Sequence, residues 1–234
     1  MKKISILLIA LFFIACNKQQ SDLTVKVNVK GLKKGTLYLK KVKDKLLVTV
    51  DSLVVNGNSN IELHSDLDSP EIFYLYLDKY TAEKDRIVFF ADKGVTEINT
   101  TLKNFPFEVR INGSKQQKIL EKYNTVISKF NNKNLDLFKE QFQAQKSGDT
   151  ARLNKLLKTA DNALKRRYLY TVNFALNHKS SEVAPYLALT EIYNARIDLL
   201  DTINTSLTPK IKTSKYGRQL ETFIKEIKNA EATN

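Results

Sequence analysis

The sequence predicts an α+β protein in which an N-terminal antiparallel β-sandwich or barrel packs on a C-terminal all-helical domain. Two observations support this prediction. Apolar residues recur with a period of two from Leu23 onward, as in half-buried strands, and the period becomes helical at Gly113-Ser114. The 234 residues are enough to bury a sizeable core. We therefore assign residues 22–113 to the β-sandwich and residues 114–234 to the helical domain.

The N-terminal half consists of short apolar segments separated by polar turns. In the first segment, Leu23, Val25, Val27 and Val29 alternate with polar residues, which predicts a strand with one buried face. Turn signals such as Asn56-Gly57-Asn58 separate the segments that follow. The pattern predicts these further strands at residues 37–39, 46–50, 61–64, 71–78, 86–91, 95–100 and 106–111.

Two of these strands are apolar on both faces. Residues 72–77 and 87–90 contain almost no polar side chain, so neither face is suited to water. We expect one face to lie in the sandwich and helices to dock on the other, on the Tyr74/Tyr76 side. An aromatic face that binds a ligand remains an alternative.

The C-terminal half has helical spacing throughout. Ser114 is a suitable N-cap, and apolar residues then follow one helical stripe to Phe130. A second helix is expected over residues 134–146, and Ser147-Gly148-Asp149 ends it. A long amphipathic helix runs to about Asn177. The sequence predicts later helices that begin after Ser180 or Ser181, after Thr208-Pro209, and near Leu220.

Residues 1–15 have the organisation of a signal peptide. Lys2 and Lys3 precede residues 4–15, which are apolar apart from Ser5. Twelve residues form a helix of roughly 18 Å, which is shorter than the roughly 30 Å hydrocarbon core of a bilayer. The segment therefore predicts export rather than a permanent membrane span.

The end of this segment resembles the lipobox of bacterial lipoproteins. Leu11-Phe12-Phe13-Ile14-Ala15-Cys16 ends in a small residue before the cysteine, although Phe13 stands where that signal usually has leucine. The resemblance implies that Cys16 receives a diacylglycerol and becomes the new N-terminus, with residues 16–21 as a tether. Two or three acyl chains anchor a protein stably. We expect the protein in the cell envelope, at the outer membrane and facing the periplasm.

The number of cysteines limits the chemistry that this chain can perform. Cys16 is the only cysteine, so lipidation leaves no protein thiolate for disulfide exchange or peroxide reduction. His64 and His178 lie in different regions with no zinc motif, and Asp66 and Asp68 lack the pattern of a calcium loop. No nucleotide-binding or hydrolase motif is present. We expect no catalytic residue, no metal site and no cofactor.

The charge is unevenly distributed. Residues 17–50 carry a net charge of +7, residues 51–113 carry −5, and residues 114–234 carry +9. Lysines close to the proposed anchor are suited either to lipid headgroups or to protecting a sheet edge, and the second interpretation is favoured. Lys165-Arg166-Arg167 is the only tight basic cluster, so we expect no nucleic-acid partner.

Several stretches, in this order, resemble the domain of unknown function numbered 4369, which is common in exported proteins of the Bacteroidota. They are VKVNVKGL at 25–32, GTLYL at 35–39, VFFADKG at 88–94, VRINGS at 109–114, NHKSSEVA at 177–184, LTP at 207–209 and SKYG at 214–217. In that family the module usually precedes a thioredoxin-like domain, whose catalytic cysteines have no counterpart in this sequence. The resemblance therefore implies an accessory module without that domain.

These observations predict a membrane-anchored, non-catalytic lipoprotein that acts as a binding or scaffolding module, accessory to thioredoxin-like partners. Its expected partners are the membrane, through the anchor at Cys16, and a protein of the cell envelope. One alternative is a lipoprotein that binds a solute or glycan in a cleft between sheet and helices. A second alternative is a hydrolase with an unrecognised carboxylate site.

Overall fold

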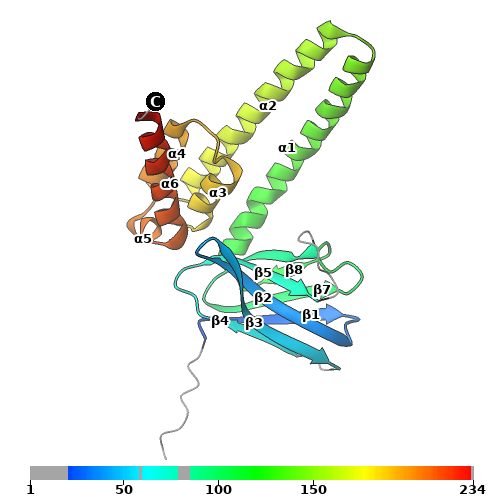
Figure 1. Ribbon diagram of the computed structural model, residues 1–234, viewed down its shortest axis with the longest axis vertical. Helices are drawn as coiled ribbons and strands as arrows, with labels where there is room; N and C mark the ends of the chain where they lie inside the picture. The colour runs from blue at the N-terminus through cyan, green and yellow to red at the C-terminus, as the bar shows by residue number, and fades with distance from the viewer. Residues whose placement is uncertain (1–20, 58–59, 79–84, 233–234) are drawn as a thin grey trace, which may run out of the picture.

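The computed structural model describes residues 21–57, 60–78 and 85–232. The predicted signal peptide, the lipid attachment site at Cys16 and most of the tether lie outside these residues. Within them, strands form one half of the molecule and helices the other, as predicted (Figure 1).

The strands form two four-stranded sheets. The first sheet has the order β4-β1-β7-β8, with β1 at Leu23–Lys30, β4 at Ile61–Ser65, β7 at Gly94–Thr101 and β8 at Arg110–Asn112. The second has the order β3-β2-β5-β6, with β2 at Lys34–Lys43, β3 at Leu46–Asn56, β5 at Glu71–Leu77 and β6 at Ile87–Ala91. They stack as a sandwich and do not close into a barrel.

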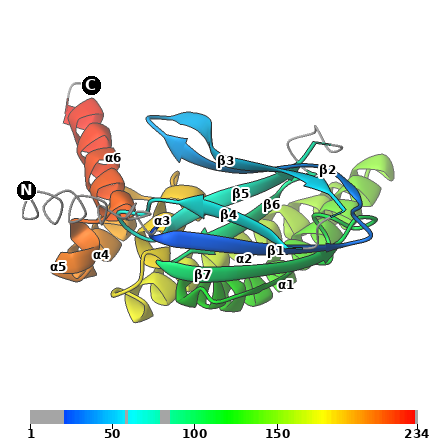
Figure 2. The ribbon, with the colours of Figure 1, turned by 90° about the horizontal axis from the view of Figure 1, so that it is seen from below.

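One pairing differs from the predicted antiparallel arrangement. β1 and β7 run parallel, with Leu23 opposite Gly94 and Lys30 opposite Thr101, and they lie side by side in Figure 2. Every other strand pair in the described residues is antiparallel. Short turns in the sequence predicted hairpins, but the chain returns to β1 only after crossing the second sheet, so no turn dictates the direction of that pair.

The inner faces of the two sheets form the first core. Leu23 and Val25 of the first sheet share this core with Leu39, Phe73 and Phe89 of the second, and all five side chains are fully buried. The rings of Phe73 and Phe89 stack with their centroids 6.0 Å apart. The period of two in the sequence is thus explained by burial of every second residue.

The strand predicted at residues 106–111 is mostly a loop. Turns occupy residues 103–107, and only the three residues of β8 pair with β7. Phe105 is fully buried, and its carbonyl accepts a hydrogen bond from the Thr100 hydroxyl at 2.9 Å. One deeply buried ring anchors this loop and replaces the expected alternation.

Six helices follow. They are α1 (Lys115–Lys146), α2 (Thr150–Asn177), α3 (Val183–Glu191), α4 (Ile197–Ser206), α5 (Pro209–Lys212) and α6 (Lys215–Ala232). The two helices predicted before Ser147 are one continuous helix, α1. No glycine or proline lies between Ser114 and Ser147, so the break expected between residues 130 and 134 does not form.

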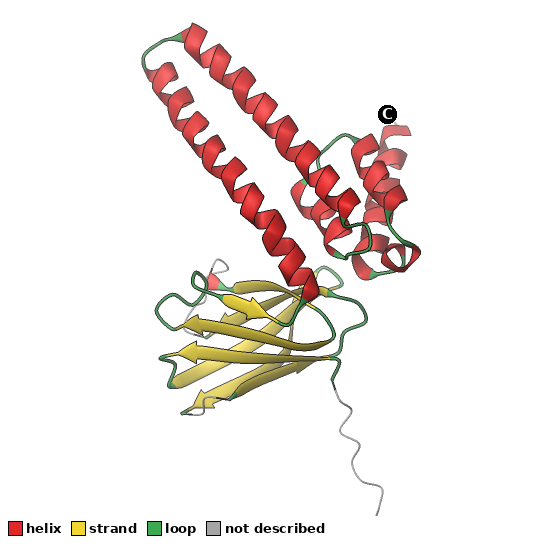
Figure 3. Ribbon diagram, turned by 180° about the vertical axis from the view of Figure 1, so that it is seen from behind, coloured by secondary structure: helices red, strands yellow, loops and turns green. Residues whose placement is uncertain are grey.

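The helices form a compact base and a projecting hairpin. The C-terminal part of α2 packs with α3, α4 and α6 around a second core that includes Val172, Ala188, Leu200 and Leu220. The outer halves of α1 and α2 extend beyond this base as a two-helix arm (Figures 1 and 3). No helix in the described part of the chain has both the length and the hydropathy needed to cross a bilayer.

A third core joins the two halves and confirms that helices cover the doubly apolar strands. Ile72 and Phe90, on the outer face of β5 and β6, pack against Tyr123, Leu187 and Tyr216 of three helices. The ring of Phe90 meets that of Tyr216 edge-on, with centroids 5.8 Å apart. The two halves therefore share buried apolar surface.

The predicted centre of this contact needs a correction. Tyr74 lies at its margin, but Tyr76 lies outside it. The Tyr76 hydroxyl accepts a hydrogen bond from Arg86 Nη1 at 3.0 Å, and Lys40 Nζ lies 4.6 Å from its ring centroid. Cationic side chains, rather than helices, cover the far end of this face.

Replacing Phe90 with Ala should lower the free energy of unfolding by about 3–5 kcal/mol, because it removes a fully buried ring from the joint between the halves. Sheets and helices should still unfold in one transition. Urea unfolding followed by near-UV and far-UV circular dichroism measures both. Tyr76→Ala on the neighbouring strand is the matched control and should cost less. Two separate transitions, only one of them moved by Phe90→Ala, would contradict the proposed cooperativity.

Candidate functional site

A pocket of about 640 Å³ opens where the sandwich meets the helices. The loop before β5, the turn between β6 and β7, the start of α1 and the segment around α5 form its walls. Its lining is mainly polar and charged: Asp68, Ser69, Pro70, Asp92, Lys93, Gly113, Lys115, Glu182, Lys210, Thr213, Ser214 and Arg218. We call it the junction pocket.

The start of α1 is held on the β6–β7 turn. Ser114 caps the helix, and its hydroxyl oxygen accepts a hydrogen bond from the Gln117 amide at 2.9 Å. Asp92 Oδ2 accepts from the Ser114 hydroxyl and from the Gln116 amide, both at 3.2 Å. Gly113 has φ +96°, and a Cβ there would lie 2.0 Å from the Val95 carbonyl oxygen, so only glycine fits. This wall of the pocket is rigidly positioned.

Side chains of α1 also satisfy buried backbone and side-chain groups. Gln117 Oε1 accepts a hydrogen bond from the Phe90 amide of edge strand β6 at 2.9 Å. Gln116 Oε1 accepts from the Ser181 hydroxyl at 2.5 Å, which ties α1 to the entry of α3. An unpaired buried amide or hydroxyl costs about 1–3 kcal/mol, so these glutamines help to fix the register of the two halves.

The opposite wall is held by a buried ion cluster. Glu71 is 5% exposed, and its carboxylate pairs with Lys41 at 3.0 Å and with Lys215 at the start of α6. Lys215 Nζ also donates to the Val42 carbonyl at 2.8 Å. The Tyr216 hydroxyl accepts from the Ile72 amide at 3.0 Å. Because removing one member of a buried pair leaves an uncompensated charge, this cluster locks α6 onto the second sheet.

Glu182 is the least exposed carboxylate of the pocket, at 2% exposure. Burial raises its pKa above the ordinary value; the Ser214 hydrogen bond and the Lys210 and Arg218 charges oppose this only in part. The Ser214 hydroxyl lies 2.5 Å from Glu182 Oε2 and 2.7 Å from the Ile211 carbonyl oxygen. One hydroxyl proton cannot serve both acceptors, which favours a protonated Glu182.

The cations of the pocket differ in how far they are neutralised. Lys93 pairs with Asp22 at 2.9 Å, and Arg218 donates to the Thr213 carbonyl. Neither Lys115 nor Lys210 forms an ion pair with another described residue. The pocket holds no histidine or cysteine. The arrangement is suited to binding an anionic group by charge.

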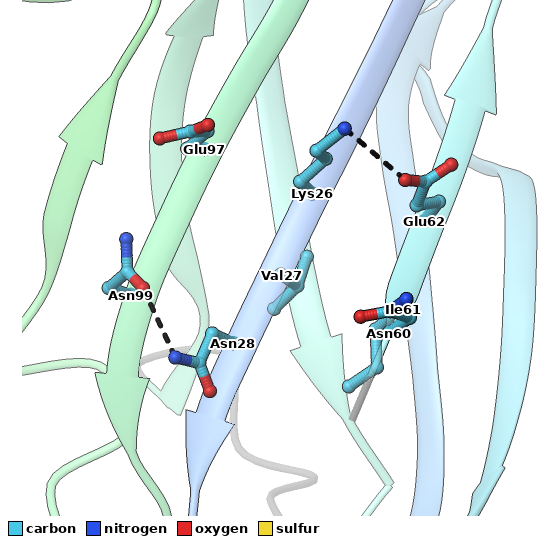
Figure 4. Close-up of a pocket in the computed structure, with 8 residues that line it drawn as sticks. All are labelled: Lys26, Val27, Asn28, Asn60, Ile61, Glu62, Glu97 and Asn99. Atoms are coloured by element: carbon cyan, nitrogen blue, oxygen red, sulfur yellow. Dashed lines mark hydrogen bonds and ion pairs between the residues drawn. The ribbon is translucent and has the colours of Figure 1, made fainter. Parts of the chain in front are cut away.

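A second concave surface lies on the solvent face of the first sheet, with a volume of about 500 Å³. Figure 4 shows its side chains on β1, β4 and β7. Lys26 Nζ lies 3.5 Å from Glu62 Oε1, and Asn28 Nδ2 donates to Asn99 Oδ1 at 3.3 Å. Glu97 lies on the same face. Amides and carboxylates on an open sheet could pair with sugar hydroxyl groups.

The structure keeps the histidines considered in the sequence apart. Exposed His64 lies on β4, with its Nδ1 3.1 Å from the Ser21 hydroxyl, and His178 caps the C-terminus of α2. Within the described ranges, no three His, Cys, Asp or Glu side chains are grouped to hold a metal ion. Asp68 lines the junction pocket, whereas Asp66 lies outside it in the same loop.

Sequence reasoning missed Glu182. It follows Ser181 in the expected break between two helices, where an acidic residue reads as solvated. The sequence feature that could have indicated its burial is the apolar run that begins directly after it at residue 183. This run places Glu182 at the edge of a buried helix.

Comparison with protein families supports part of the resemblance. Residues 23–120 match the model described as Domain of unknown function (DUF4369). The match spans the eight described strands and the first residues of α1. The similar stretches at 177–184, 207–209 and 214–217 lie outside it. No curated protein matches the chain.

The buried Glu182 makes a pH-dependent prediction. Because its pKa is raised in the folded state, the folded protein binds more protons than the unfolded chain between the ordinary pKa near 4.5 and the raised value. The free energy of unfolding should therefore fall as pH rises through that window. Glu182→Gln should remove this decline and be at least as stable as the wild type at neutral pH.

Urea unfolding across a pH series measures this effect. Glu226→Gln, an exposed position on α6, controls for the loss of one carboxylate. Parallel pH profiles for the wild type and Glu182→Gln would contradict the prediction.

Proposed function

We propose that the chain is a lipid-anchored, non-catalytic binding module of the bacterial cell envelope. The lipobox-like run that ends at Cys16 supports the anchor, and the DUF4369 match over residues 23–120 supports an exported accessory module. On this proposal the protein lies at the outer membrane and faces the periplasm. Its protein partners would carry thioredoxin-like domains, in keeping with the resemblance noted above.

The junction pocket is the observation that carries the binding role. Asp92, Ser114 and Ser181 are engaged in hydrogen bonds that hold the two halves together. Lys115 and Lys210 supply cationic groups without an ion-pair partner among the described residues. A preformed pocket with spare cations favours binding of a small polar solute that carries an acidic group, rather than turnover.

A second candidate is glycan binding at the face in Figure 4. Its amide and carboxylate side chains, Asn28, Asn99 and Glu97 among them, favour neutral hydroxyl-rich ligands over acidic ones. The two candidates therefore differ in the charge of the ligand and in the strand or helix that binds it.

The anchor is tested directly by mass spectrometry of the mature N-terminus. The wild-type protein purified from membranes should begin at Cys16 and carry the mass of its acyl chains. Cys16→Ser should remain unprocessed and unlipidated. A mature chain that begins elsewhere, or an unmodified Cys16, would refute the proposed anchor.

The pocket is tested with two ligands of similar size, glucuronate and glucose. Glucuronate should raise the melting temperature of the wild type, because a ligand at about 100 times its Kd stabilises the folded state by about 2.7 kcal/mol. Lys115→Ala with Lys210→Ala should abolish the difference between the two sugars. Lys155→Ala, on the projecting hairpin, is the matched control.

Stabilisation by glucose or neutral oligosaccharides alone, lost in Asn99→Ala, would instead favour the second candidate. If neither class stabilises the protein, small-solute binding at both surfaces is wrong, and a protein partner is left as the proposed ligand.

A further inference from the structure

The projecting hairpin exposes apolar side chains that no described part of the chain covers. On α1, Leu135, Phe138 and Phe142 are 53%, 67% and 62% exposed. Their spacing of three and seven residues places them on one side of the helix. Leu137 and Ala144 of the same helix are buried, so the exposed row lies away from the contact with α2.

α2 contributes a second row. Leu157 and Leu164 are 51% and 40% exposed and lie seven residues apart, which also places them on one side of their helix. An ion pair between Arg152 of α2 and Glu140 of α1, at 3.4 Å, joins the two helices along one side of the hairpin.

Successive residues of a helix are rotated by about 100° around its axis. On this spacing, the apolar row of each helix lies on the side away from the Arg152–Glu140 pair. The two rows therefore share one side of the hairpin. We call these five residues the hairpin apolar face: Leu135, Phe138, Phe142, Leu157 and Leu164.

The surroundings of this face are positively charged. Residues 129–165 contain eight basic and four acidic residues. Three of the acids pair with hairpin cations, in Lys139–Asp136, Arg152–Glu140 and Lys165–Asp161. Asp149 caps α2. Five exposed lysines therefore have no ion pair within the described chain: Lys129, Lys133, Lys146, Lys155 and Lys158.

We propose that the hairpin apolar face docks on an anionic lipid surface, with its leucine and phenylalanine side chains among the headgroups and acyl boundary. Apolar residues flanked by surplus lysines have the character of an interfacial membrane helix. The face is borne on a projecting arm rather than in a groove, so a deformable surface suits it. A second copy would bring two cationic arms together, which repel each other.

This docking differs from the proposed anchor in residues and in position. The face runs along the side of the hairpin, so contact lays α1 and α2 parallel to the membrane plane. It does not depend on acylation of Cys16 or on occupation of the junction pocket.

The test uses the chain from Ser21 onward, which retains every described strand, helix and core residue and excludes both the signal segment and Cys16. The probes are vesicles of phosphatidylcholine, with or without about one quarter phosphatidylglycerol. The sequence contains no tryptophan, so Phe138→Trp introduces a single reporter. Its emission should shift to the blue with anionic vesicles only. Phe107→Trp, on a sandwich loop with 79% exposure, is the matched control and should not shift.

Phe138→Ala with Phe142→Ala should weaken vesicle binding about tenfold or more in sedimentation assays, since two apolar rings are lost from the interface. Helix content should be unchanged, because alanine favours helices. Added salt should also weaken binding.

Three results would overturn the proposal. Equal blue shifts at both tryptophans would place the contact elsewhere. Undiminished binding of the double alanine variant would reduce the contact to general charge attraction. Absence of binding to anionic vesicles would assign the face to a protein partner instead.

Discussion

The structure depends on covering the outer face of β5 and β6. Ile72 and Phe90 point away from the sandwich core and would expose a large apolar patch if the sheet ended there. Helices from three separate parts of the C-terminal half supply the cover, through Tyr123, Leu187 and Tyr216. Because the cover is drawn from α1, α3 and α6 together, this one contact sets the position of three helices against the sandwich.

Burying that face also buries the polar groups beside it. These groups need hydrogen-bond or ion-pair partners inside the protein. The Phe90 amide donates to Gln117, the Ile72 amide donates to Tyr216, and Glu71 pairs with two lysines. Each partner comes from the other half or from a neighbouring strand, as expected when unpaired buried groups are costly. The junction pocket lies at the rim of this contact, where charged side chains reach solvent. Its rigidity is therefore a consequence of the apolar contact.

Much of this fold was predictable from the period of the apolar residues. The alternation of apolar and polar residues identified β1, and the absence of polar residues identified β5 and β6 as covered strands. Both patterns are visible in a short stretch of sequence because they depend only on which faces of a strand are buried. The parallel pair β1–β7 was not predictable, since no local pattern encodes the direction of a distant partner. The apolar stripe that ends at Phe130 suggested a break before residue 134, whereas α1 is one continuous helix. Glu182 was hidden because its burial arises only where α3 meets the segment around Ser214.

The continuous α1 connects the two surfaces to which roles are proposed. Its first turn contributes Lys115 and Gln116 to the junction, while Phe138 and Phe142 lie six or more turns further along the same helix. A helix of 32 residues is roughly 48 Å long and has no kink-forming residue, so its direction is fixed by Asp92 and Gln117 at the sandwich. Whatever the hairpin contacts is thereby held at a set distance and angle from the pocket. Had the helix ended at Phe130, as the sequence pattern suggested, the arm could swing about residues 131–133 and that relation would be lost.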